Sequence, residues 1–518
     1  MRREMKYVIA YDLGTGGLKT SIFGADGLSQ GFSFMPYETS FPAEGYREQR
    51  PAIWWDAVKA TTKEVLSDTG IPSADIVSLA VSGHSLGALP IGFDGELLAE
   101  YVPIWNDSRA NEEAKDFFAK TSEEEWYLTT GNGFPPELYS VFKILWYKKN
   151  MPEVYEKTDK FIGTKDYINY QLTGVLATDR SYASGCGVFS LADGAYCEKY
   201  IAISGVDKNK LPKILDSTDV VGRVLPAVAA ELGLSPETLV IAGGVDNACM
   251  ALGAGCIDNG DVYTSLGTSA WIAVCDEKAV VDTENRPYVF AHCLPKKYVS
   301  AVAIFSAGNT LKWVRDKLFC DLLAAEKNGG EPSYRSIDRL ASESPVGANK
   351  LIFVPTLAGG SSIDKSPDAK GCFFGLDLMH TRSDIARATL EGIALNLGVI
   401  LDVLKKYVSV GDEMLLVGGG ANSEVWRQIF ADVYGMHIAA ARVGQDAGSF
   451  GAAVLAAIGA GVWSDYGMVR RLVKNEKLTA PDTASAKRYK ALLPAYKKLL
   501  DISSDVGDIL GSLGDDGV

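Results

Sequence analysis

The sequence has few of the residues that build structural metal sites or disulfide frameworks. Its 518 residues include eight Cys and four His, and no two Cys form a C-x-x-C pair. Zinc modules need Cys and His at short, repeated spacings, so this class of protein is excluded. We expect the thiols to be reduced and buried, which indicates a cytoplasmic protein.

Excess positive charge and long apolar runs are missing as well. Asp and Glu number 65 against 51 Lys and Arg, which gives a formal net charge of −14. Nucleic acids and anionic membranes repel such a chain, so we expect neither as a partner. No apolar run reaches the roughly 20 residues of a membrane span, and the first run stops at Asp12, too early for a signal peptide. The small-residue run Gly448–Val462 is typical of a packed helix.

Hydrophobic residues are plentiful, at 47% of a chain much longer than the roughly 100–200 residues of one domain. We therefore expect at least two domains with buried cores. Turns and repeats predict an N-terminal lobe at 1–255 and a C-terminal lobe at 256–480. A helix and an acidic tail follow at 481–518, and we expect Asp501–Val518 to fray.

The most informative pattern is a glycine hairpin that occurs twice. Leu13-Gly14-Thr15-Gly16 lies between two apolar strands, and Leu266-Gly267-Thr268-Ser269 repeats the arrangement. The N–H groups and the hydroxyl at such a tip form a concavity that binds phosphate oxygens. Two copies predict two related lobes that hold one polyphosphate between them. The predicted phosphate-binding residues are Gly14, Thr15, Gly16, Gly17, Lys19, Gly267 and Thr268.

The first hairpin alone carries a carboxylate, Asp12, just before its turn. Mg2+ usually takes one or two carboxylates together with phosphates and waters, so this asymmetry predicts a magnesium ion at Asp12. The loop is not a Walker A motif, because Leu18 separates Gly17 from Lys19-Thr20. Lys19 reaches a phosphate in this interpretation, whereas the alternative is a solvated strand lysine.

A strand, a glycine turn and a helix also occur twice. Leu239–Ala242 leads into Gly243-Gly244-Val245-Asp246, and Leu415–Val417 leads into Gly418-Gly419-Gly420. Halves with the same order of elements predict a duplicated α/β fold with a ligand cleft between the lobes. Asp246 at such a turn is either a general base for an attacking hydroxyl or the cap of the helix that follows.

Two short segments suit a sugar. In Trp105-Asn106-Asp107 the indole can cover C–H surface while the polar groups bind hydroxyls. His84-Ser85 follows the predicted strand Asp75–Val81. Both segments also fit buried structural residues, and they become site residues only if their strands border the cleft.

These motifs resemble the FGGY family of carbohydrate kinases, and within it the xylulokinase-like branch. The family signatures are matched by Ser140–Trp146 and by Gly371–Leu376 followed by Asp384–Glu391. Glu48–Trp55 is similar to a segment of xylulokinases. The resemblance implies an α/β, actin-like (ribonuclease H-like) ATPase fold in two lobes, with ATP and Mg2+ in a central cleft, and a homodimer.

The resemblance also implies roles for individual residues. Asp246 would be the base, Asp12 would hold the metal, and Gly418, Gly419 and Asn422 would lie against the adenosine. The substrate-binding residues would be His84, Ser85, Trp105, Asn106, Asp107, Asp246 and Asn247.

Two departures from the family pattern concern the substrate. Gly83–Ala88 reads G-H-S-L-G-A where xylulokinases usually have G-Q-M-H-G-A, and Gly359-Gly360-Ser361 replaces a G-E-R segment. We expect ATP-dependent phosphorylation of a ketopentose, D-xylulose to D-xylulose 5-phosphate. Ribulose, gluconate, a tetrulose and autoinducer-2 are alternative substrates. Rivals from other classes are a nucleotide-switched binding protein and a non-catalytic sugar or nucleotide sensor.

Overall fold

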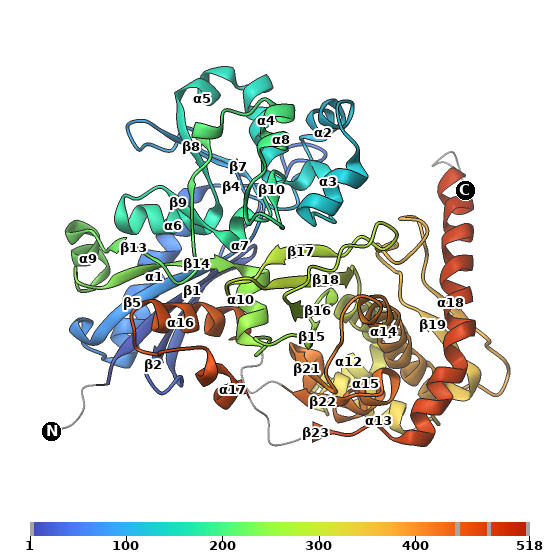
Figure 1. Cartoon of the computed structure of the whole chain (residues 1–518). Coiled ribbons are helices and arrows are strands. Elements are labelled where there is room, and N and C mark those ends of the chain that lie inside the picture. The colour runs from blue at the N-terminus through green and yellow to red at the C-terminus, as the bar shows by residue number, and fades with distance from the viewer. Residues whose placement is uncertain (1–4, 441–445, 474–477, 514–518) are drawn as a thin grey trace. The chain divides into compact units, whose positions relative to one another are not determined.

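The computed structural model describes residues 5–440, 446–473 and 478–513, which form a mixed α/β structure (Figure 1). The described residues fall into two compact units. Unit 1 takes those of Met1–Ile257, Cys275–Ser300 and Asp446–Val473, and unit 2 takes the remainder. The sequence-based ranges follow the order of the chain, whereas each compact unit is assembled from separate segments.

Unit 1 is built on a six-stranded sheet with the order β13-β14-β5-β1-β2-β3. Its strands are β1 (Tyr7–Gly14), β2 (Gly17–Gly24), β3 (Ser29–Pro36), β5 (Ile76–Gly83), β13 (Val220–Arg223) and β14 (Leu239–Val245). β1, β2 and β3 are antiparallel neighbours, whereas β1, β5 and β14 run parallel. The carboxyl ends of these three parallel strands therefore meet at one edge of the sheet. Asp12, His84 and Asp246 lie at or just beyond those ends.

Helices cover both faces of this sheet. α1 (Pro51–Thr69) and α6 (Thr164–Thr173) pack on one face, where Tyr11 of β1 bonds Thr62 of α1 at 2.9 Å. α16 (Ala447–Gly459) covers the other face, where the Ser78 hydroxyl donates to the Ala456 carbonyl at 2.8 Å. Burial on both faces explains why these strands are nearly continuous apolar runs. The helix expected over Gly448–Val462 is α16, and no described helix is long and apolar enough to cross a membrane.

Between β5 and β13 the chain adds a mostly helical region with a core of its own. Its helices are α2 (Asn111–Phe118), α3 (Glu123–Thr130), α4 (Ser140–Asn150), α5 (Pro152–Lys157), α7 (Arg180–Ala183) and α8 (Glu198–Ser204). Phe117, Trp126 and Phe142 are buried there and meet edge to face. Such aromatic packing fixes the position of α4, which carries one of the family-like signatures.

A second sheet has the order β17-β18-β16-β15-β21-β22-β23. Its strands are β15 (Asp261–Leu266), β16 (Ala270–Asp276), β17 (Tyr288–Ala291), β18 (Tyr298–Ile304), β21 (Glu413–Val417), β22 (His437–Ala440) and β23 (Leu478–Thr479). β15, β21 and β22 run parallel. The order β18-β16-β15-β21-β22 therefore repeats the order β3-β2-β1-β5-β14, as expected of a duplicated α/β fold.

The topology corrects one detail of the predicted repeat. β14 pairs with β5, one place away from β1, whereas β21 pairs directly with β15. The counterpart of β21 is therefore β5, and the matching of Leu239–Ala242 with Leu415–Val417 was wrong. A strand, glycine turn and helix recur throughout parallel α/β folds, so the local pattern does not reveal a strand's place in the sheet.

The described part of unit 2 also contains helices, two of which are longer than any described helix of unit 1. The helices of unit 2 are α11 (Gly308–Leu318), α12 (Cys320–Lys327), α13 (Ser333–Glu343), α14 (Arg382–Lys405), α15 (Glu424–Tyr434) and α18 (Thr483–Ser512). α14 is almost entirely buried and begins with a capping box, in which Asp384 accepts the Thr381 N–H at 2.8 Å. Such a box fixes where the helix starts.

The expected fraying of Asp501–Val518 was wrong as far as Ser512, because α18 continues to that residue. The Ser503 hydroxyl donates to the Lys370 carbonyl. Gly507 packs so closely on Asp368 that a Cβ there would lie 2.1 Å from its carbonyl oxygen. These contacts give the acidic helix a docking surface that composition does not reveal, and residues 514–518 lie outside the described part of the chain.

Candidate active site

The hairpin between β1 and β2 places Asp12 in a tight polar setting. Its Oδ1 accepts the Ser82 hydroxyl from β5 at 2.9 Å. Gly448, in the first turn of α16, lies against the same carboxylate, because a Cβ at this position would be 2.8 Å from Asp12 Oδ2. Because residue 448 is glycine and has no side chain, the Asp12 carboxylate can occupy this space.

Opposite charges gather around this carboxylate. Lys19, directly across the hairpin from Asp12, forms an ion pair with Asp446. Burial raises the pKa of Asp12, and the charge of Asp446 raises it further, while Ser82 and Lys19 lower it. A bound cation would reduce the repulsion between the Asp12 and Asp446 carboxylates. In residues 5–440, 446–473 and 478–513 no cluster of three or more metal-ligating side chains occurs. Mg2+ usually takes only one or two carboxylates, and Asp12 can supply one.

Asp246 is the first residue of α10 (Asp246–Gly253), and the capping position belongs to Val245. Its Oδ1 accepts the backbone N–H of Asn247 at 2.8 Å and the Asn247 side-chain amide at 3.0 Å. Burial raises the pKa of Asp246 to about 7, and the nearby charge of Asp12 contributes to the increase. A carboxylate that exchanges its proton near neutral pH suits a general base.

Close helix packing sets the spacing between these carboxylates. A Cβ at Gly253 of α10 would lie 1.8 Å from the Ala447 carbonyl, and one at Gly451 of α16 would lie 1.9 Å from the Cys249 carbonyl. The two backbones therefore touch, which only glycine permits at both points. α10 carries Asp246 and the start of α16 lies on Asp12, so this contact ties the two acids together.

Side chains hold the tip of the first hairpin. Tyr37 donates to the Gly14 carbonyl at 2.6 Å, and Gln49 donates to the Thr15 carbonyl at 2.7 Å. The Trp105 indole N–H donates to the Thr15 hydroxyl at 3.0 Å. Across the described residues, the backbone N–H groups of Thr15 and Gly16 donate to no protein acceptor. The tip thus presents N–H groups, as the phosphate-binding hypothesis requires.

The segment Trp105-Asn106-Asp107 contacts this tip, and the polar groups of Asp107 and Asn106 differ in whether they have hydrogen-bond partners. Asp107 is fully buried, and Arg109 and the Arg47 N–H occupy its carboxylate at 2.6–3.1 Å. This geometry orients the loop and leaves Asp107 little capacity to bind a sugar. The Asn106 side-chain oxygen is buried and has no hydrogen-bond partner among the described residues, so it is available for a ligand hydroxyl.

His84 and Ser85 are both buried beyond the end of β5. Neither ring nitrogen of His84 has a protein partner within the described chain, and burial lowers its pKa to about 3, so the ring is neutral. Leu86, next along the chain, has φ of +61°, a strained value for a side chain of this size. Lys143 holds the strained turn by donating to the Leu86 carbonyl at 2.9 Å and to the Ile104 carbonyl at 2.6 Å.

Unit 2 contains the second group of predicted residues around a cavity of about 600 Å³. The tip of the β15–β16 hairpin, the start of α11, one side of α13 and the turn after β21 line it. Gly267, Thr268, Gly419 and Asn422 are all part of this lining, as the sequence predicts for a nucleotide site. Gly418 does not line the cavity, but its φ of +97° lets the turn pass close to the backbone of Leu266.

Sequence reasoning missed several residues of this cavity. They are Gly308, Asn309, Lys312, Tyr334, Arg335, Asp338, Ser423 and Trp426. Gly308 and Asn309 donate their N–H groups to the carbonyls of Gly267 and Thr268 at 3.0 and 3.1 Å, so α11 supports the second hairpin. The Ser306–Asn309 segment contains a small-residue turn before a helix, a signal that could have indicated this contact.

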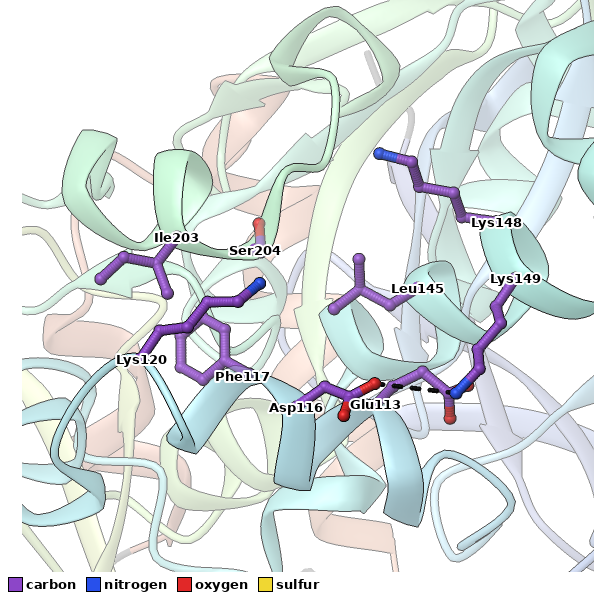
Figure 2. A pocket seen from close by; sticks show the side chains of 9 residues that line it. All are labelled: Glu113, Asp116, Phe117, Lys120, Leu145, Lys148, Lys149, Ile203 and Ser204. Carbon is purple, nitrogen blue, oxygen red and sulfur yellow. Dashed lines mark ion pairs between the residues drawn. The ribbon is translucent and has the colours of Figure 1, made fainter.

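A second cavity, of about 230 Å³, lies between α2, α4 and α8 (Figure 2). Phe117, Leu145 and Ile203 line its apolar part, and Lys149 pairs with Glu113 and Asp116 at 3.8 and 3.7 Å. None of the predicted site residues lines this cavity. It therefore contributes nothing to the candidate active site.

Comparisons with known proteins find a match for each half of the chain. Residues 7–253 match the N-terminal domain of the FGGY family of carbohydrate kinases, and residues 262–460 match its C-terminal domain. The chain is 28% identical over 509 residues to a xylulose kinase of Bacillus subtilis (strain 168), which covers 98% of this chain and 99% of that protein.

Solved structures show the same similarity. A ligand-bound xylulose kinase from Lactobacillus acidophilus has a TM-score of 0.86 at 26% identity, over 95% of this chain and 97% of that one. A gluconate kinase from the same organism has a TM-score of 0.88 at 26% identity, over 98% of this chain and 100% of that one. The fold is thus the actin-like ATPase fold of sugar kinases, with ATP and a sugar as the implied partners. Because the two domain matches together span most of its length, this chain belongs to the FGGY family of carbohydrate kinases.

Proposed function

We propose that this enzyme transfers the γ-phosphate of ATP to D-xylulose, producing D-xylulose 5-phosphate, with Asp246 as general base. The observation that carries the proposal is Asp246 itself, a carboxylate with a pKa of about 7 at the start of α10, electrostatically coupled to Asp12. A base with this pKa is ionised in half of the molecules at neutral pH and readily accepts the hydroxyl proton.

Each predicted site residue has a distinct part in this reaction. Asp246 accepts the proton of the sugar hydroxyl as the hydroxyl oxygen attacks the γ-phosphorus, and Asp12 would hold the Mg2+ ion that accompanies ATP. Bound Mg2+ supplies charge neutralisation on the phosphates. The N–H groups of Thr15 and Gly16, together with Lys19, stabilise the transferring phosphoryl group. Gly267, Thr268, Gly418, Gly419 and Asn422 bind the nucleotide in unit 2.

The choice of a neutral ketose over a sugar acid rests on charge. Gluconate would need a cation for its carboxylate. Arg109, which lies against the predicted sugar segment, is engaged by Asp107 and Glu48 at 2.7 Å, and Lys143 donates to backbone carbonyls. His84 is neutral because its pKa is about 3. Neutral hydrogen-bonding groups at His84, Ser85, Asn106 and Asn247 suit hydroxyl recognition instead.

Similarity to the xylulokinase branch supports the same choice through the segment Glu48–Trp55. Gln49 bonds both the Thr15 carbonyl and the Trp54 indole, and Glu48 pairs with Arg109. This segment therefore supports the hairpin tip and the sugar loop together. Because ATP is a cytoplasmic metabolite, we propose the cytoplasm as the compartment of the reaction. The homodimer implied by the family resemblance stays a prediction.

The test is an ADP-release assay with Mg-ATP against xylulose, ribulose, tetruloses, polyols, gluconate and autoinducer-2. We expect the highest kcat/KM with D-xylulose, and gluconate as the preferred substrate would contradict the charge argument. For the preferred sugar, kcat should rise with pH to half its maximum near pH 7, because the ionised base is the active form. Asp246→Asn should lower kcat by about 10³-fold or more, and retained turnover would remove Asp246 as the base.

A further inference from the structure

The last residues of β14, just before Asp246, depart from regular strand geometry. β14 pairs with β5 in register as far as Ile241, and the register then shifts before Gly244. Two residues, Ala242 and Gly243, are thus accommodated opposite Val81 alone. Gly243 has φ of +73°, and a Cβ there would lie 2.2 Å from the Val81 carbonyl oxygen. This bulge directs the chain into Asp246, as bulges beside active sites often do.

Side chains from α6 and α7 hold both ends of the bulge. At its start, the Ala242 carbonyl accepts hydrogen bonds from Lys165 Nζ at 3.1 Å and from Asn169 Nδ2 at 2.9 Å. At its end, the Val245 N–H donates to the Ser181 hydroxyl oxygen at 2.9 Å. Val245 directly precedes Asp246, so the second contact lies one residue from the carboxylate.

Asp179 links these two contacts. One of its carboxylate oxygens pairs with Lys165 Nζ at 2.9 Å. The other accepts the Ser181 hydroxyl at 2.5 Å and the Ser217 hydroxyl at 2.7 Å. Lys165, Asp179 and Ser181 are all 0% exposed. The Ser181 hydroxyl donates to Asp179 and accepts from Val245, so its orientation is fixed on both sides.

Stability alone is a poor reason for such a network. Lys165 is also paired with Asp166 at 2.6 Å, so one buried ammonium faces two carboxylates. Taking three charges out of water costs free energy that their attraction does not reliably recover, and apolar residues in their place often stabilise a fold equally well. A buried polar network of this kind defines one conformation of the chain segment that it holds.

From these contacts we infer that Lys165, Asp179 and Ser181 are positioning residues that set the place of the base Asp246 by clamping the bulge of β14. The inference rests on the proposed role of Asp246. A displacement of about 1 Å in a reacting group costs up to roughly 100-fold in rate, so the clamp contributes mainly to kcat. The nucleotide cavity shares no residue with it.

Ser181→Ala tests the inference, with Ser217→Ala as the matched control. Both substitutions remove one buried hydroxyl from the same Asp179 oxygen, but only Ser181 also bonds the Val245 N–H. We expect Ser181→Ala to lower kcat about 10- to 100-fold with KM for ATP within about 2-fold, and Ser217→Ala to change both by less than about 3-fold. Ser181→Thr, which keeps the hydroxyl, should recover most of kcat.

Amide hydrogen exchange of peptides covering 240–247 gives a readout that needs no turnover. Faster exchange in Ser181→Ala than in Ser217→Ala is expected, and equal exchange would overturn the clamp. Should Ser181→Ala misfold, Asn169→Leu removes one of the two donors at the other end of the bulge and should show a smaller loss of kcat. If exchange rises while kcat stays unchanged, the clamp does not position the base. If the parent enzyme phosphorylates no sugar in the panel, the proposed function fails, while the exchange data still test the clamp.

Discussion

The two glycine hairpins share the sequence Leu-Gly-Thr but differ in what surrounds them. Side chains of Tyr37, Gln49 and Trp105 hold the first tip, and Asp12 stands beside it. Backbone N–H groups at the start of α11 hold the second tip, and Ser265 stands where the first has Asp12. Both copies have Leu-Gly-Thr at the tip, whereas only the first has a carboxylate before it. From this difference we propose that the first hairpin acts in the chemical step and the second in nucleotide binding.

The largest expected effect contrasts the two equivalent positions. Asp12→Asn should lower kcat about 10²- to 10⁴-fold and raise the Mg2+ concentration needed for activity, because it removes the charge that anchors the ion. Ser265→Ala, at the matching place in β15, should change kcat by less than about 3-fold. Initial rates over a Mg2+ titration measure kcat and the Mg2+ requirement of each variant. Similar losses in the two variants would contradict the proposed difference between the hairpins.

Glycine substitutions beside each hairpin should change different kinetic constants. Gly448→Ala places a Cβ 2.8 Å from Asp12 Oδ2, so we expect a loss of about 10- to 100-fold in kcat with KM for ATP nearly unchanged. Gly308→Ala places a Cβ 2.3 Å from the Gly267 carbonyl oxygen and should raise KM for ATP about 10-fold.

Gly411→Ala is the control for this pair, because its nearest neighbouring atom would be 3.7 Å away. We expect it to leave both constants within about 2-fold. Steady-state kinetics with ATP varied at saturating sugar separate the cases. The division of labour would be refuted if Gly448→Ala acted chiefly on KM for ATP.

Two indole hydrogen bonds of equal length test whether the side-chain support of the first hairpin tip matters for activity. Trp105→Phe removes the 3.0 Å bond to the Thr15 hydroxyl at the first tip. The loss of about 1 kcal/mol should lower kcat/KM roughly 3- to 10-fold. Trp271→Phe removes the 3.0 Å bond to Tyr263 within unit 2 and should leave kcat/KM within about 2-fold. Equal effects would show that the side-chain support of the first tip has no special role.

The last expected effect is on stability and not on rate. The pKa of Asp246 is raised to about 7 in the folded state, so burial of the ionised carboxylate destabilises the fold at pH 8 and less so at pH 5. Asp246→Asn should therefore stabilise the ligand-free protein by about 1–3 kcal/mol more at pH 8 than at pH 5. Urea unfolding at the two pH values measures this, and a gain that does not depend on pH would show that the carboxyl is not buried in ionised form.

Much of the fold could be predicted from the sequence, because its signals are local. Glycine turns and apolar spacing in the sequence indicate the hairpins at Gly14–Gly17 and Gly267–Ser269, the helix after Pro51 and the packed helix near Gly448. The place of β21 could not be predicted in this way, since strand pairing is a long-range property. α18 beyond Asp501 was missed for the same reason, because its packing partner lies at Asp368.

The candidate site was predictable only in part. Asp12 and Asp246 stand out because a carboxylate beside glycines is visible in the sequence. Asp107 shows the limit, since its partner Arg109 is only two residues away, yet nothing in the sequence says that the carboxylate is fully occupied. The positioning roles of Lys165 and Ser181 could not be predicted, because they depend on contacts with β14 that the sequence does not reveal.

Lys143 has a consequence for how this scaffold acquires new substrates. Its amino group donates to the carbonyl oxygens of Leu86 and Ile104, which every amino acid possesses. The side chains at positions 84, 85 and 106 can therefore be exchanged without removing either of these hydrogen bonds. Evolution, or a mutant library confined to these positions, can explore different hydroxyl patterns while the backbone that presents them stays in place.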